Sequence, residues 1–143
     1  MLKKLLTSVV VCSAVALVFP SSASAVTVCD NFGREWDLAF SACPDAPGGF
    51  CVSGSRDIFN ELGCGPFPVY GTFVKNVFSV TTLDDAVDAC VSVSWRGPYN
   101  GINVTGTWEN EGPSTGAFTL APCAPGPPDA NNEKIDEDPQ VSR

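Results

Sequence analysis

Apolar and polar residues alternate along most of this chain, and the alternation is clearest between Ala89 and Ala121. Three segments of this stretch (89–95, 102–108 and 116–120) place an apolar residue or a glycine at every second position. Such a period of two predicts β-strands with one buried face. The Gly, Pro and Asn residues between the segments supply the dihedral angles that turns need. We therefore predict an antiparallel β-meander in this part of the chain.

The preceding part of the chain alternates in the same way and predicts five further strands. They cover 26–29, 36–42, 50–54, 67–73 and 78–80. Seven or eight antiparallel strands with neighbouring connections can close as an up-and-down barrel, which removes the exposed sheet edges. The predicted fold class is therefore all-β, as a small barrel of this kind or as a flattened sandwich version of it.

Three hairpins allow a parity test, because residues opposed across a real hairpin must face the same side of the sheet. We take 75–76, 98–101 and 45–49 as the turns. The opposed pairs are then Phe73 with Phe78 and Gly71 with Val80, Trp95 with Val104 and Val93 with Gly106, and Ala42 with Val52 and Cys43 with Cys51. Parity agrees within all three hairpins, which supports the meander more strongly than any single strand does.

A short template recurs at 50–55, 67–72 and 102–107, with the form apolar-x-Val-x-Gly-Ser/Thr. Its glycines, Gly54, Gly71 and Gly106, fall on the inward parity. An inward glycine usually marks a sharp bend or a close approach of two backbones, and repeated bends let a sheet coil and close. Coincidence within a glycine-rich β protein is the alternative interpretation.

The segment from Met1 to Ala25 is typical of a bacterial secretory signal peptide. Lys3 and Lys4 form its positive region, residues 5–19 form its apolar core, and Ala23-Ser24-Ala25 matches a cleavage site. The apolar run is shorter than the ~20 residues that a membrane span needs. We therefore expect cleavage after residue 25, a β-domain over 26–123, and no transmembrane span in the mature chain.

Six cysteines remain after the leader, at positions 29, 43, 51, 64, 90 and 123. An even number in a small exported domain indicates three disulfides. Barrel closure and outward parity favour Cys29–Cys123, hairpin parity favours Cys43–Cys51, and Cys64–Cys90 remains. A metal site is the rival interpretation, but the chain has no histidine and no C-x-x-C pair. These features predict a secreted or periplasmic protein.

Charge narrows the choice of partners. The whole chain has 8 basic and 16 acidic residues, and loss of Lys3 and Lys4 lowers the formal net charge from −8 to about −10. This acidity disfavours nucleic acids and anionic membranes as partners. Residues 124–143 combine Pro with acidic and amide residues and contain few apolar ones, so we expect a disordered tail.

The sequence offers little support for an enzyme. The absence of histidine removes the commonest general base, and oxidised cysteines are not nucleophiles. Asp84, Asp85 and Asp88 cluster in one predicted loop and Glu109 and Glu111 near another, which is ordinary for solvated turns. We predict no catalytic residue, no cofactor and no metal site, and a hydrolase is the least favoured function.

An eight-stranded barrel is either filled by its own side chains or holds one small ligand. The alternation predicts that many aromatic residues face the inside of the barrel. Four of them are the candidates to line a ligand cup: Trp95, Trp108, Phe73 and Phe78. On this hypothesis the inward glycines leave space for the ligand. On the alternative, the aromatic residues only pack the core.

Two segments, 104–110 (VTGTWEN) and 116–120 (GAFTL), together with 69–73 and 78–80, resemble secreted bacterial avidin-like or lipocalin-like β-meander proteins. Those families bind biotin or apolar molecules inside the barrel, so the resemblance implies a possible small ligand. The leading hypothesis is therefore a non-enzymatic binding module for a small apolar molecule or a glycan. A structural or interaction protein of the envelope or extracellular space, with a filled core, is the alternative.

Overall fold

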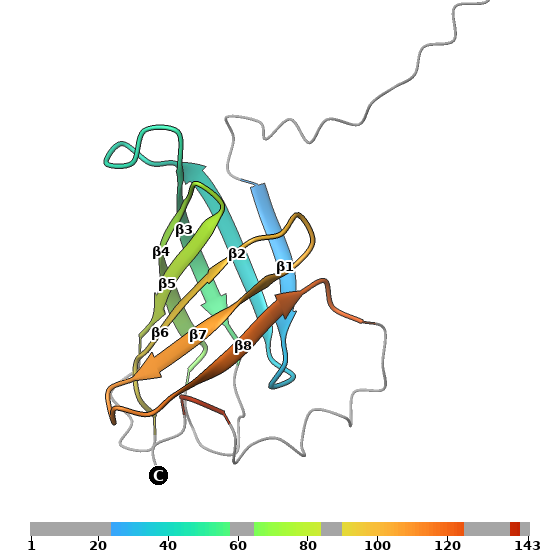
Figure 1. Ribbon diagram of the computed structural model, residues 1–143, viewed down its shortest axis with the longest axis vertical. Helices are drawn as coiled ribbons and strands as arrows, with labels where there is room; N and C mark the ends of the chain where they lie inside the picture. Colours follow the sequence, from blue (N-terminus) through green and yellow to red (C-terminus); the bar gives the residue numbers. More distant parts are fainter. Residues whose placement is uncertain (1–23, 58–64, 84–89, 125–137, 141–143) are drawn as a thin grey trace, which may run out of the picture.

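The computed structural model describes residues 24–57, 65–83, 90–124 and 138–140, and it shows an all-β chain (Figure 1). Eight antiparallel strands follow one another in sequence order and close into a barrel. The strands are β1 (Ser24–Asp30), β2 (Glu35–Ala42), β3 (Phe50–Arg56), β4 (Phe67–Val74), β5 (Val77–Thr82), β6 (Val93–Pro98), β7 (Val104–Asn110) and β8 (Thr115–Ala121). The predicted disulfide-braced up-and-down barrel is confirmed.

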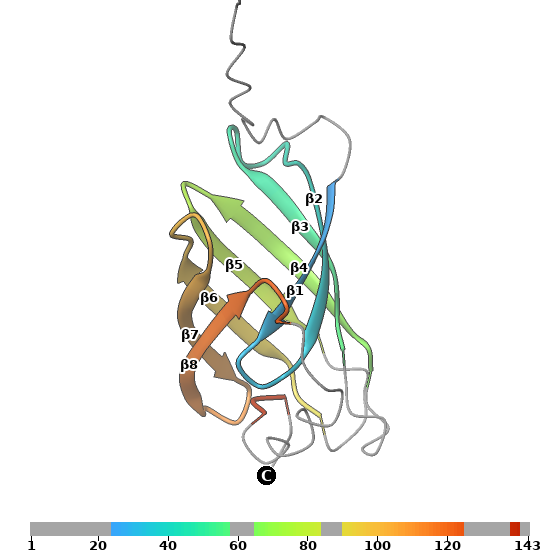
Figure 2. The same ribbon diagram turned by 90° about the vertical axis from the view of Figure 1, so that its right-hand side faces the viewer.

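The barrel has two ends that differ in their connections. The turns at 43–49, 75–76 and 99–103 lie at one end, which we call the upper end (Figure 1). The turns at 31–34 and 111–114 lie at the opposite, lower end, next to the short segment 138–140 (Figure 2). This alternation follows from the up-and-down topology, because successive hairpins open in opposite directions.

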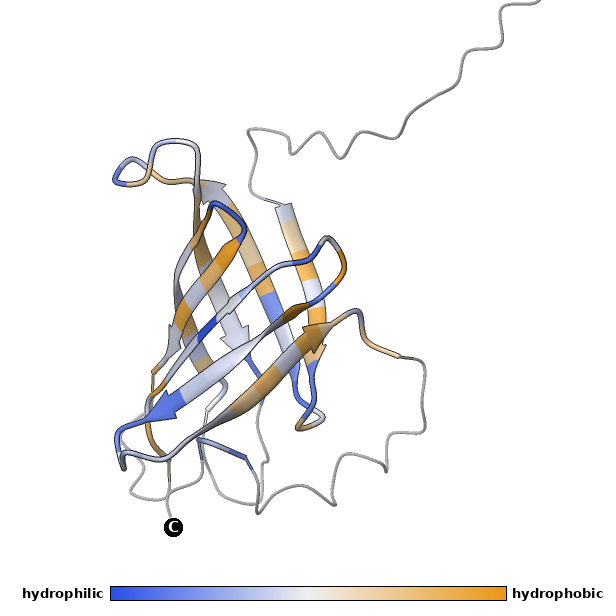
Figure 3. Cartoon of the chain, viewed as in Figure 1, coloured by the Kyte–Doolittle hydropathy of each residue, from blue (hydrophilic) through white to orange (hydrophobic). Residues whose placement is uncertain are grey.

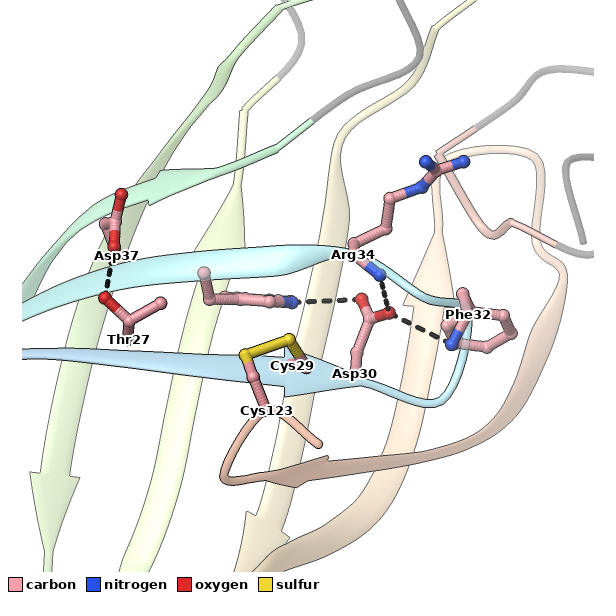
Figure 4. Close-up of a disulfide and its surroundings, with 8 residues drawn as sticks. Thr27, Cys29, Asp30, Phe32, Arg34, Asp37 and Cys123 are labelled. Carbon is pink, nitrogen blue, oxygen red and sulfur yellow. Dashed lines mark hydrogen bonds between the residues drawn. A yellow bond between two sulfur atoms is a disulfide. The ribbon is translucent and has the colours of Figure 1, made fainter. Parts of the chain in front are cut away.

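A short seam closes the barrel between β1 and β8. Only two residue pairs join these strands, Cys29 with Ala121 and Asp30 with Leu120. The disulfide between Cys29 and Cys123 lies beside them, with a Cα–Cα distance of 4.8 Å (Figure 4). The predicted pairing of Cys29 with Cys123 is therefore confirmed, and the covalent bond reinforces the shortest ladder of the sheet.

The second predicted disulfide, Cys43–Cys51, is also confirmed and spans the β2–β3 turn. Cys90 takes part in a disulfide as well, whereas its predicted partner, Cys64, lies outside the described residues. Disulfides persist in oxidising compartments, so the two described bonds fit an extracellular or periplasmic protein. In the described part of the chain, no helix has the length and apolar character that crossing a bilayer requires.

Most of the predicted leader lies outside the described residues. Its last two residues, Ser24 and Ala25, form the start of β1 and pair with Phe40 and Ala39 of β2. Cleavage after Ala25 would shorten β1 to five residues, of which the first four keep their pairing with β2, from Val26 with Leu38 to Cys29 with Glu35.

The predicted pairing of Phe73 with Phe78 is confirmed, as is that of Gly71 with Val80. The other two predicted registers are wrong, although their parity is right. The structure pairs Trp95 with Trp108 instead of Val104, and Val93 with Asn110 instead of Gly106. A shift by an even number of residues preserves the parity of the pairs, so the predicted inward and outward sets survive the error except near the two turns.

The side chain of Asn100 explains the register of the β6–β7 hairpin. Its Oδ1 accepts hydrogen bonds from the backbone N–H groups of Ile102 at 2.9 Å and Asn103 at 2.8 Å. Such an Asx turn moves the reversal beyond the predicted 98–101. Consequently β6 continues to Pro98, and Ile102, which was predicted to face inward, lies in the turn with 71 % of its surface exposed.

The β2–β3 hairpin differs from its predicted register by two residues. Phe40, rather than Ala42, pairs with Val52, and Ser41, rather than Cys43, pairs with Cys51. The turn is longer than predicted because the Ala46 N–H donates to the Cys43 carbonyl and the Gly49 N–H donates to the Ala46 carbonyl. Ala42 is therefore exposed near the upper end instead of facing the core.

The repeated glycines permit a close approach of neighbouring backbones. A Cβ atom at Gly54, Gly71 or Gly106 would collide with the carbonyl oxygen of Asp37, Ser79 or Arg96, respectively. The predicted backbone approach is thus confirmed. The suggestion that these glycines leave space for a ligand is wrong, because adjacent strands occupy that space.

The centre of the barrel is filled by aromatic side chains. The ring of Trp95 lies edge-to-face with Trp36 at 5.2 Å and with Phe118 at 5.3 Å, measured between centroids. Trp36 in turn lies 6.4 Å from Phe78. Apolar and polar residues are interspersed along the strands in Figure 3, as expected when one face of the sheet packs this core and the other meets solvent.

Candidate functional site

The four residues predicted to line a ligand cup do not form one wall. Trp95 and Phe78 are buried, with 0 % and 2 % exposure, and both contact Trp36 in the central cluster. Trp108 is partly buried, and its indole lies where a side chain on Gly116 would be. Phe73 is also partly buried and belongs to a separate aromatic group at the upper end.

This upper group joins three strand ends. Phe73 lies edge-to-face with Phe40 at 6.2 Å and with Tyr99 at 5.8 Å. The Tyr99 N–H donates to the Asn76 carbonyl at 2.7 Å, which ties the end of β6 to the β4–β5 turn. All three rings remain only partly buried, so this end of the barrel presents accessible aromatic surface.

The inner face of β1 extends the same surface. Since β8 ends beside Cys29, the first part of β1 is paired with β2 but not with β8. Val26, which pairs with inward-facing Leu38, is 42 % exposed as a result. We call Val26, Phe40, Phe73 and Tyr99 the upper mouth.

The lower end contains a buried charge cluster centred on Asp30, the last residue of β1. Asp30 Oδ1 accepts hydrogen bonds from the backbone N–H groups of Phe32 at 3.0 Å and Arg34 at 2.9 Å. Oδ2 accepts from the indole N–H of Trp36 at 2.9 Å (Figure 4). It also accepts from Arg56 Nη2 at 2.8 Å and Nε at 3.0 Å. One carboxylate thus organises the β1–β2 turn and holds a guanidinium from β3.

A second carboxylate reaches the cluster from the end of the chain. Asp138 Oδ2 accepts from Arg34 Nε and Arg56 Nη2, both at 3.0 Å, while Oδ1 accepts from Arg56 Nη1 at 3.0 Å. Asp138 is 5 % exposed and Gln140 is 1 % exposed. Residues 138–140 are therefore buried against the barrel, and the prediction of a disordered tail is wrong for them. The rest of that tail, 125–137 and 141–143, lies outside the described residues.

Opposite charges compensate the cost of burying this cluster. Burial alone raises the pKa of the Asp138 carboxyl, but the charge of Arg56 and the hydrogen bonds from Arg56, Gln140 and Arg34 outweigh it. The pKa of Asp138 is therefore held below its ordinary value. Burial opposes the charged guanidinium of Arg56, yet Asp30 and Asp138 raise its pKa above the ordinary value. For Arg34, burial dominates and lowers the pKa; arginine nevertheless stays protonated at neutral pH.

Sequence reasoning missed this cluster. Asp30 directly follows the predicted strand 26–29, and Asp138 lies in the predicted tail. Arg56 was the available signal, because it follows Gly54 at a spacing of two and therefore falls on the inward parity of β3. A charged residue facing the core requires a partner, but the sequence does not show which carboxylate supplies it.

An acidic pocket of about 330 Å³ lies on the outer side of β2 and β3. Its lining residues are Glu35, Asp37, Ser55, Asp57 and Pro66. The Thr27 hydroxyl donates to Asp37 at 2.6 Å. The sulfurs of Cys29 and Cys123 lie close to Glu35, but they are bonded to each other and cannot act as thiolate ligands for a metal.

Comparison with known proteins identified no relative, since no protein-family model, curated protein or solved structure matches this chain. The resemblance to avidin-like and lipocalin-like proteins stays a prediction.

Proposed function

We propose that this protein is a non-enzymatic binding module that takes a small apolar ligand at its upper mouth. One observation carries the proposal. The aromatic rings of Phe40, Phe73 and Tyr99 face the inside of a closed barrel and yet remain partly exposed, whereas Trp36 and Trp95 at its centre are fully buried.

The arrangement of the rings supports a planar or compact ligand. Edge-to-face contacts within the group leave ring surface free to pack against a guest, and one such aromatic contact contributes about 0.5–1.5 kcal/mol beyond burial. The filled centre limits the depth of the site, and the charge cluster with residues 138–140 occupies the lower end. A ligand therefore enters from above. A glycan ring stacked on the same aromatic surface is the other chemistry that fits.

A neutral environment-sensitive dye, N-phenyl-1-naphthylamine, tests the proposal in fluorescence titrations. We expect saturable binding of one dye per chain. Phe73→Ala should weaken binding by about tenfold, because it removes the ring that contacts both other aromatic residues. Tyr70→Ala is the matched control: Tyr70 lies on the same strand but is 56 % exposed, so its loss should leave the dye affinity unchanged.

Absence of saturable binding, or equal weakening by both substitutions, would contradict a site at the upper mouth. Thermal unfolding of both variants separates lost binding from lost fold. A titration with short neutral oligosaccharides, read by tryptophan fluorescence, distinguishes glycan binding from binding of apolar molecules.

A structural or interaction protein is the second candidate, and the filled barrel centre favours it. If the interior is packed, a partner protein must bind to the outer surface. Glu35, Asp37 and Asp57 line one pocket there. On this alternative the dye does not bind, whereas polylysine associates in a salt-dependent way. Glu35→Gln should then weaken polylysine binding more than Glu109→Gln, which alters an exposed acid on a different strand.

A further inference from the structure

The segment Asp138–Gln140 binds to the lower end of the barrel through residues that are far from it in sequence. Its partners are distant in sequence: Arg56 precedes Asp138 by 82 residues and Arg34 precedes it by 104. The Asn110 side-chain amide donates to the Pro139 carbonyl at 3.1 Å. The Val91 N–H donates to the Gln140 carbonyl at 3.0 Å. Four separate parts of the barrel end thus converge on three residues.

The buried charges of the described residues favour an anion at this end of the barrel. Arg34 and Arg56 supply two positive charges, and Asp30 supplies one negative charge, all of them buried. Among the described residues of the cluster, Asp138 supplies the second negative charge, and removing one partner from a buried ion pair is strongly unfavourable. The barrel alone therefore forms a receptor for a carboxylate.

The guanidinium of Arg56 also has partners that do not belong to the segment. Asp30 accepts two hydrogen bonds from Arg56. The guanidinium also lies over two indole rings, 5.0 Å from the centroid of Trp95 and 5.6 Å from that of Trp36. Such cation–π contacts, together with the ion pair, hold the planar group in place. Its Nη1 and Nη2 atoms then point at the carboxylate of Asp138.

We propose that the lower end of the barrel is a peptide-binding site for an acidic segment of the form Asp-Pro-Gln, and that Asp138–Gln140 is a tethered ligand occupying it in cis. The same segment of a second copy of this chain binds there in trans when it displaces the tether. This site is independent of the upper mouth, so either proposal can fail without the other.

The contacts define the specificity of the site. Both carboxylate oxygens of Asp138 are used, which selects for a carboxylate over an amide. Gln140 Oε1 accepts from Arg56 Nη1 at 2.9 Å, and its Nε2 donates to the Val91 carbonyl at 3.4 Å. An amide side chain two residues after the acid thus satisfies both a donor and an acceptor of the barrel.

The test converts the tether into a free ligand. A specific protease site is inserted within 125–137 of the full chain, the chain is folded and cut, and a fluorescein-labelled peptide with the sequence of residues 135–143 is added. We expect the labelled peptide to bind the cut protein with an anisotropy increase. A matched peptide carrying Asp138→Asn should bind at least about tenfold more weakly, because it lacks the charge-assisted hydrogen bonds.

Tethering keeps the cis segment at a local concentration that a free peptide must exceed. The uncut chain should therefore bind the labelled peptide at least about tenfold more weakly than the cut chain. Equal binding by cut and uncut chains, equal binding of both peptides, or no exchange into a cut protein that keeps its near-ultraviolet circular dichroism would each overturn the proposal.

Uncut variants provide a second route if cutting unfolds the chain. Asp138→Asn or Gln140→Ala weakens the tethered ligand while leaving Arg34 and Arg56 in place. Either variant should bind the labelled peptide with the native sequence of residues 135–143 at least about tenfold more tightly than the parent chain does. If a folded variant of this kind binds no better than the parent, the segment is a structural plug and the proposal is wrong.

Discussion

Asp30 and Arg56 are joined by two hydrogen bonds, from Nη2 at 2.8 Å and Nε at 3.0 Å, although 26 residues separate them in sequence. They are the last residues of β1 and β3. Their contact therefore links two strands that are not neighbours in the sheet and crosses the lower end of the barrel. The contribution of this ion pair to the free energy of unfolding can be measured with a single substitution.

We expect Asp30→Asn to lower the free energy of unfolding by about 3–5 kcal/mol, since it removes one partner of a buried ion pair. Urea denaturation followed by tryptophan fluorescence gives the value. Asp37→Asn is the matched control, because Asp37 is an exposed acid on the neighbouring strand β2; we expect a change within about 0.5 kcal/mol. Similar effects of the two substitutions would contradict a structural role for the cluster.

The lowered pKa of Asp138 predicts a pH dependence of stability. A carboxyl whose pKa is lower in the folded than in the unfolded state contributes stability that is complete above its unfolded value of about 3.9 and is lost as the pH falls through the folded value. The difference in unfolding free energy between the parent chain and Asp138→Asn should therefore be constant from pH 5 to 7. It should shrink as the pH falls below about 4. A difference that grows on acidification would refute the assignment.

Gly106 should tolerate no side chain. A Cβ atom there would collide with the Arg96 carbonyl and approach the Gly97 Cα. We expect Gly106→Ala to destabilise the protein by about 1–3 kcal/mol or more, through forced separation of β6 and β7. Gly112→Ala provides the control, because its nearest neighbour would be Asn110 Oδ1 at an ordinary 3.5 Å. Thermal unfolding of both variants checks the prediction, and an unaffected Gly106→Ala variant would show that the strands can move apart at little cost.

The two described disulfides should differ in their contributions to stability. The chain-entropy account assigns about 4–5 kcal/mol to Cys29–Cys123, which closes a separation of 94 residues, and about 2–3 kcal/mol to Cys43–Cys51, which closes 8. Paired Cys→Ser variants measured by chemical denaturation test this order. The reverse order would indicate that the seam between β1 and β8 persists without its covalent bond.

Alternation of apolar and polar residues was sufficient to predict the strands, the faces of most of their side chains and the closure of the sheet. Cys29 and Cys123 could be paired on that basis, because closure places the first strand beside the last. The same argument could not locate the registers of two hairpins. Parity is insensitive to a shift of two or four residues, and the β6–β7 shift depends on hydrogen bonds from the side chain of Asn100.

Tertiary structure alone decided which residues meet at the two ends of the barrel. The local composition around Asp138 favours disorder, yet Arg56, which lies 82 residues earlier, gives its carboxylate a buried partner. Likewise, Tyr99 joins Phe73 only because the β6 and β4 strand ends are brought together. Periodicity is a local property that the order of residues contains, whereas pairing of charges and rings across a barrel depends on distances that only the folded chain defines.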